Sequence, residues 1–240
     1  MDSASASVIA AAGAVGAFEA VAWGVDLQPY TSHSPMPAYV RALLVSLNAA
    51  PHLALAVCGC PPVGLAAYLP YAAFFTSAQA SNWWWPYLVG LRGPSSDTLI
   101  AHVAGSAKLL PPLRGRPAPS AEHTLLFPLS LASLTLGVRA WLRLPAATRA
   151  SAGNSPAALG AAGLTAAAAA AGVVRELVVL LKRLRAATTE AAAEGGGRND
   201  EKPMAVAAND PLPFVHAAIV GSVLWWLRAS TSADAAAWQG

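Results

Sequence analysis

The side chains of this chain that could carry chemistry are a few polar groups set inside long apolar segments. The candidates for a shared polar pocket are Glu19, Asn48, His52, Gln79, Asn82, Glu122 and His123. Ionisable groups within a membrane span are costly, and they usually face the bundle interior, a water cavity or one another. In a pocket of this kind Glu19 or Glu122 would exchange protons, with His52 or His123 as the partner.

A structural role explains the same residues. Glu19 then pairs with a histidine or an amide to fix helix packing, while Glu122 and His123 belong to the start of a helix at the interface. The chain has no phosphate-cradling glycine loop, no G-x-S-x-G nucleophile and no H-E-x-x-H motif. The sequence therefore assigns no catalytic residue, and it leans against an enzyme without deciding the question.

Cofactors and metals have little support in the sequence. Cys58 and Cys60 stand one glycine apart in an apolar segment, within reach of His52. Two neighbouring thiols lack the second pair that makes a zinc signature convincing. We interpret both cysteines as small apolar packing residues and expect neither a metal nor a cofactor.

The composition indicates which solvent surrounds these groups. The 240 residues are 55% hydrophobic and only 11% charged, with a mean hydropathy of +0.47. Soluble domains carry roughly 25% charged residues, so the balance favours a membrane protein. A net charge of +3 is too small and too dispersed along the chain to suggest nucleic-acid binding, and we expect no nucleic-acid partner.

The elements that must hold the polar groups are apolar segments long enough to cross a bilayer. Spans are predicted over residues 3–25, 40–60, 63–89, 124–142 and 157–181, which form a main bundle within residues 1–185. Residues 186–210 read as a flexible polar linker, and 211–228 as a short C-terminal helix that also spans. The predicted fold is an all-α, polytopic integral membrane helix bundle of five to six transmembrane helices.

Local signals refine some of these helices. Pro51 should kink the second span near Asn48, and Ser120 should cap the fourth. The aromatic run Trp83–Tyr87 is typical of an anchor at the membrane–water interface. The first segment is a retained helix or, alternatively, a cleaved signal peptide with an A-x-A site at residues 20–22.

The positive charges predict an orientation. If the spans alternate, most lysines and arginines gather on one side, including those of the long connection from Arg92 to Glu122. Cationic loops resist translocation, so this side should be cytoplasmic or its organellar equivalent, with both termini on the opposite side. The Trp83–Tyr87 run would then lie in the cytoplasmic half.

Two functions remain open from the sequence. The first is a non-catalytic scaffold or accessory subunit of a membrane assembly, favoured by Ala-rich helices and the absence of catalytic motifs. The second is a membrane-embedded enzyme or carrier for a small amphipathic or lipid-like molecule, with the polar pocket in the cytoplasmic leaflet. The expected partners are the lipid bilayer and either other membrane subunits or such a ligand.

Overall fold

The computed structural model describes residues 3–25, 27–31, 37–90 and 103–167, together with the single residues 178, 182 and 185. The described part is helical, and its one β-type contact is an isolated bridge between Leu113 and Arg116. Its elements in chain order are α1 (Ser3–Gly24), α2 (Ala38–Asn48), α3 (Ala50–Cys58), α4 (Pro62–Gln79), the π-helix η1 (Ala80–Trp84), α5 (Trp85–Leu88), α7 (Ala121–Arg143) and α8 (Ala146–Gly153).

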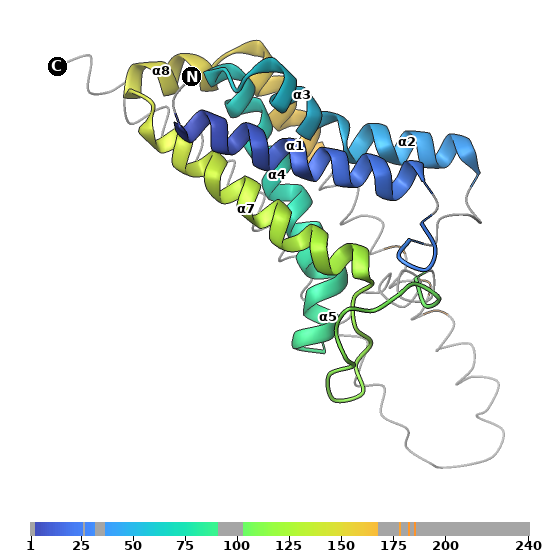
Figure 1. The fold of residues 1–240 in the computed structure, drawn as a ribbon. Helices are drawn as coiled ribbons and strands as arrows, with labels where there is room; N and C mark the ends of the chain where they lie inside the picture. Colours follow the sequence, from blue (N-terminus) through green and yellow to red (C-terminus); the bar gives the residue numbers. More distant parts are fainter. Residues whose placement is uncertain are drawn as a thin grey trace, which may run out of the picture.

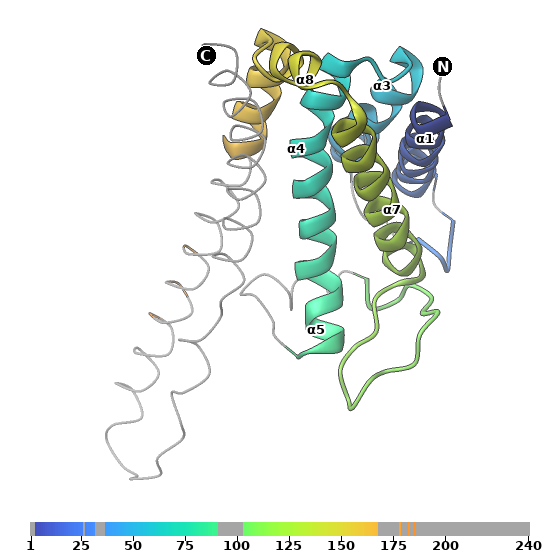
Figure 2. The ribbon, with the colours of Figure 1, turned by 90° about the vertical axis from the view of Figure 1, so that its left-hand side faces the viewer.

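α1 and α4 both lie along α7, and α3 packs against α1 and α4 (Figures 1 and 2). The largest fully buried side chain, Trp141 of α7, belongs to a core with Leu65 and Leu69 of α4 and Val8 of α1. A smaller cluster joins Val15 of α1, Phe75 of α4 and Leu126 of α7 nearer the α5 end.

Small residues allow the closest helix approaches. A Cβ atom added at Gly16 of α1 would lie 2.7 Å from Leu53 Cγ and 3.1 Å from the Ala49 carbonyl oxygen. One added at Gly137 of α7 would lie 3.0 Å from Leu69 Cδ2. Helices in lipid gain much of their association energy from such close packing, because lipid tails are as apolar as leucine.

The predicted second span is broken. α2 ends at Asn48, α3 begins at Ala50, and the two axes differ by 44°. Pro51 causes the break because it has no N–H to donate to the carbonyl of Leu47 and its ring crowds that carbonyl. The kink predicted near Asn48 is confirmed.

The predicted third span corresponds to α4, η1 and α5 in succession. Gly59 and Cys60 both adopt positive φ, so the chain turns sharply into Pro61 and Pro62 and α4 packs back on α3. The π-helix inserts an extra residue into the turn that contains Trp83 and Trp84, the first two residues of the tryptophan run. It ends at Trp84, where α5 takes over with Pro86 in its first turn.

α7 starts as its sequence predicts. Ser120 is the N-cap, its hydroxyl accepts from the backbone N–H of His123, and Glu122 lies in the first turn. The helix begins at Ala121, three residues before the predicted boundary, because the cap and not the first apolar residue sets the start. The short helix α8 after it was not predicted.

Among the residues that the structure describes, two helices, α1 and α7, are long and apolar enough to cross a membrane. A third crossing results if the bent pair α2 and α3 counts as one span. The last described stretch, a helix over Pro156–Ala167, is apolar but shorter. The predicted linker 186–210 and helix 211–228 lie outside the described residues, as does most of the second half of the span predicted over 157–181.

The contact at Gly16 yields a matched pair of substitutions. Gly13→Ala would place its Cβ in ordinary contact, 3.6 Å from Ala56 Cβ, and should stabilise α1 by about 0.5–1 kcal/mol through helix propensity. Gly16→Ala should instead destabilise the protein by about 1–3 kcal/mol, because Leu53 and α3 must move. Thermal unfolding in detergent measures both. Equal melting temperatures for the two variants would contradict this approach of α1 to α3.

Candidate functional site

Glu19 lies almost fully buried on α1, with 1% of its surface exposed. Its side chain is hydrogen-bonded with those of Trp23, one turn further along α1, and Asn48, the last residue of α2. It also interacts electrostatically with Glu122 of α7. Among the described residues, Glu19 Oε2 has no hydrogen-bond partner.

Asn48 lies beside Glu19 at the break between α2 and α3. In an unbroken helix the Leu47 carbonyl would accept from residue 51, which is Pro51 and has no N–H. The Tyr71 hydroxyl of α4 takes its place, donating to the carbonyl oxygens of Leu47 at 3.1 Å and Asn48 at 2.9 Å. The backbone of Asn48 is thereby held by α4, while its side chain binds Glu19 of α1.

His52 forms a second polar centre, on α3. Its Nδ1 lies 2.7 Å from the Tyr68 hydroxyl, which in turn lies 2.7 Å from Ser133 Oγ of α7. Tyr68, Tyr71 and Phe75 of α4 surround the imidazole edge-on, with centroids 5.2–5.4 Å away. The histidine is buried, and in the described part of the chain its Nε2 has no hydrogen-bond partner.

His123 belongs to a third centre, where α7 begins. Its Nδ1 lies 2.6 Å from Ser120 Oγ, and its ring contacts that of Trp83 at a tilt of 34°, with the centroids 3.8 Å apart. Trp84 Nε1 donates to the His123 carbonyl at 3.4 Å. The tryptophan run of the sequence therefore packs on the start of α7, with Trp83 buried and Trp84 and Trp85 half-buried.

The predicted polar residues thus fall into separate groups. Glu19, Asn48 and Glu122 meet across three helices, whereas His52 and His123 each have other partners. Gln79 and Asn82 are half-buried, and neither is a partner of Glu19 or His52 in the described part. Sequence reasoning missed Tyr68, Tyr71 and Ser133. The sequence does contain a signal for the tyrosines, because both lie in the middle of an apolar segment, far from the predicted interface. A buried tyrosine hydroxyl usually needs a hydrogen-bond partner.

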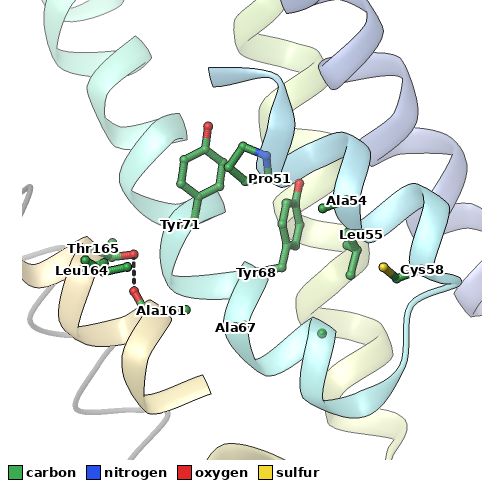
Figure 3. A pocket seen from close by; sticks show the side chains of 11 residues that line it. Pro51, Ala54, Leu55, Cys58, Ala67, Tyr68, Tyr71, Ala161, Leu164 and Thr165 are labelled. Carbon is green, nitrogen blue, oxygen red and sulfur yellow. Dashed lines mark hydrogen bonds between the residues drawn. The ribbon is translucent and has the colours of Figure 1, made fainter. Parts of the chain in front are cut away.

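A pocket of about 360 Å³ opens beside these centres, between α3, α4 and the Pro156–Ala167 helix (Figure 3). None of the predicted site residues lines it. Its wall is formed by Pro51, Ala54, Leu55, Cys58, Gly64, Ala67, Tyr68, Tyr71, Ala161, Leu164 and Thr165. Thr165 Oγ1 donates to the Ala161 carbonyl at 2.8 Å, so its hydroxyl is already satisfied (Figure 3).

Two properties of this wall limit its ligands. It contains no charged side chain, and the hydroxyls of Tyr68 and Tyr71 already bond to protein atoms. Cys58 on the wall is exposed while Cys60 is buried, so the two thiols face different surroundings. The pocket can hold an apolar group but offers little to a charged one.

The long connection folds onto the α5 end of the bundle. The Tyr87 hydroxyl donates to the Pro111 carbonyl at 3.0 Å, and Arg116 donates to the Leu88 carbonyl. The Ala107 N–H donates to the Pro29 carbonyl at 2.6 Å, which joins this connection to the one after α1. Partial burial lowers the pKa of Lys108, whose Nζ donates to the Val103 carbonyl at 2.8 Å.

The chain of hydrogen bonds through Tyr68 gives a direct prediction. Tyr68→Phe keeps the ring but removes the hydroxyl that serves both His52 and Ser133. Leaving those buried groups without a partner should cost about 1–3 kcal/mol. Tyr39→Phe is the matched control, because Tyr39 is 75% exposed and its loss should change stability by less than about 0.5 kcal/mol. Thermal unfolding in detergent compares them, and equal stabilities would rule out the hydrogen-bond chain.

Comparisons of the chain with protein-family models, with curated proteins and with solved structures found no match. The features of the chain that bear on its function are the buried Glu19 group, the His52 chain and the apolar pocket.

Proposed function

We propose that the chain is a multi-pass membrane protein that binds the hydrocarbon part of a lipid-like molecule in the pocket between α3, α4 and the Pro156–Ala167 helix. The observation that carries this proposal is the pocket itself, with its uncharged wall and a volume of about 360 Å³. Pockets for small ligands usually range from roughly 300 to 1,000 Å³. A hydrocarbon segment needs no hydrogen-bond partner and is the group that such a wall suits best.

The surroundings of the pocket favour entry from the bilayer. Leu164, which lines it, is 75% exposed, and Val57, next to the lining residue Cys58, is 84% exposed. Large apolar side chains exposed to this degree are costly in water but not in lipid. A ligand dissolved in the membrane would reach the pocket between α3 and the Pro156–Ala167 helix without passing through water.

The proposed topology has crossings by α1, by α2 with α3, by α4 with η1 and α5, by α7, by the span over 157–181 and by the helix over 211–228. The contact between Ala107 and Pro29 supports it, because this contact joins two connections that alternation assigns to one side. These connections and their flanks carry Arg41, Arg92, Lys108, Arg114 and Arg116. This side is cytoplasmic, or its organellar equivalent, and both termini lie opposite.

Photo-crosslinking tests the binding site. The purified chain in lipid nanodiscs would be illuminated with a long-chain fatty acid carrying a diazirine, and the modified peptides mapped by mass spectrometry. Adducts should lie on α3, on the first half of α4 and on the Pro156–Ala167 helix. Ala67→Trp should fill the pocket and weaken binding by about tenfold, equivalent to about 1.4 kcal/mol.

The matched control for Ala67→Trp is Leu131→Trp, on α7. Leu131 is 46% exposed and does not line the pocket, so this variant adds the same ring at a lipid-facing position. It should bind the probe as the unmodified chain does. Equal crosslinking of both variants, or adducts spread evenly over all helices, would overturn the proposal.

A second candidate, an accessory subunit of a membrane assembly, is favoured by one observation on α2. This helix has no buried residue, and Tyr39, Leu43 and Leu47 form an exposed apolar stripe at four-residue spacing. In the proposed topology this stripe faces the bilayer, and a neighbouring subunit would pack on it in place of lipid. After gentle detergent extraction from its own membrane the chain should then run far above 24.4 kDa plus its micelle, and a monomer would contradict this role.

A further inference from the structure

The surroundings of Glu19 contain no compensating positive charge. Its partners are Trp23 of α1, Asn48 of α2 and Glu122 of α7, and no lysine or arginine is among them in the described part of the chain. Glu19 and Glu122 are also the only acidic residues in that part. Both carboxyl groups are buried, with exposures of 1% and 4%.

The titratable groups that face Glu19 come from each helix around it. Glu122 from α7 and the phenol of Tyr71 from α4 both interact electrostatically with it. α2 contributes the neutral amide of Asn48, while its one cation, Arg41, lies about two turns from Asn48 and is not among the partners of Glu19. On α3, Nδ1 of His52 bonds to the Tyr68 hydroxyl. His123, beside Glu122, bonds to Ser120. Every one of these neighbours is neutral or negative unless a histidine is protonated.

Such surroundings favour an uncharged carboxyl group. An ionised carboxylate removed from water costs several kcal/mol unless it is paired with a cation. Two neighbouring carboxylates add mutual repulsion, so one of them tends to retain a proton. One oxygen of Glu19 accepts from Asn48 or Trp23, whereas Oε2 has no hydrogen-bond partner among the described residues and is free to carry that proton.

We propose that Glu19 is a reversible proton-binding site inside the membrane. An O–H bond forms at Oε2 when the carboxylate takes a proton from water at the nearby interface, and the proton returns there when the bond breaks. Glu19 lies five residues before the end of α1, about 8 Å at 1.5 Å per residue, so the interface is close. The site is separate from the apolar pocket, which Glu19 does not line.

A membrane-soluble carbodiimide tests this site. Dicyclohexylcarbodiimide partitions into lipid, adds the protonated carboxylic acid across its C=N bond and rearranges to a stable N-acylurea. The purified full chain in nanodiscs at neutral pH should carry the adduct on Glu19, as located by peptide mass spectrometry. Once the carboxyl ionises, labelling should fall about tenfold for each further unit of pH.

Three controls keep the test specific. Glu19→Gln should lose the adduct, and the unmodified chain unfolded in SDS should also lose it at neutral pH, because water then surrounds the carboxylate. Glu190 and Glu194, in the predicted polar linker, should remain unlabelled in the same peptide map. A melting curve recorded before labelling confirms that each nanodisc sample is folded.

Several results would overturn the proposal. These are the absence of an adduct on Glu19 in the folded chain, equal labelling of Glu19 before and after unfolding, and labelling of Glu190 and Glu194 to the same extent. Suppression of the adduct by sodium at constant ionic strength would also overturn it, because the site would then bind a metal cation in place of the proton.

Discussion

The missing N–H of Pro51 is the constraint on which the contacts around Leu47 and Asn48 depend. It leaves the Leu47 carbonyl without its helical donor, and the chain bends by 44° between α2 and α3. In a water-free setting such a carbonyl needs another donor, and the Tyr71 hydroxyl supplies it from α4. The hydrogen bond from Tyr71 thus joins α4 to the end of α2 at the bend.

This bend connects the buried carboxyl group to the apolar pocket. Asn48 ends α2 at the bend, and its side chain binds Glu19 while its carbonyl accepts from Tyr71. The ring of Tyr71 is part of the pocket wall, as is Pro51. A ligand that displaced this ring would therefore disturb the hydrogen bond that holds Asn48, and through it the surroundings of Glu19. The proposed carboxyl site and the proposed pocket bind different groups, but Tyr71 connects them. Its ring lines the pocket, and its hydroxyl donates to the carbonyl of Asn48, the partner of Glu19.

The sequence was informative wherever a local rule determines the backbone. Apolar length predicted α1 and α7, proline predicted the break before α3, and Ser120 predicted the cap of α7. It was less informative about side-chain partners, because these depend on the rotation of each helix about its own axis. The sequence prediction grouped His52 with Glu19 because both residues lie at a similar depth along their helices. In the structure, α3 is rotated so that His52 contacts Tyr68, which in turn bonds to Ser133.

The pocket could not have been predicted from the polar residues of the sequence or from their depth along the helices. Its wall is made of alanine, leucine, proline and the faces of tyrosine rings, residues that look like ordinary core in the sequence. α4 itself is not among the described helices that are apolar enough to count as spans, because it carries Tyr68, Tyr71, Thr76 and Gln79 within eighteen residues. A helix that packs against others on several faces needs less apolar surface than one that faces lipid all round.

The membrane topology is the claim on which the other proposals rest, and labelling of single cysteines tests it most directly. In a chain with Cys58→Ala and Cys60→Ala, one cysteine would replace Ser3 at the start of α1 or Leu113 in the long connection. In sealed vesicles with the cytoplasmic face outside, a membrane-impermeant maleimide should modify Leu113→Cys at once and Ser3→Cys only after detergent is added. Modification of both cysteines in sealed vesicles, or of Ser3→Cys alone, would contradict the proposed topology.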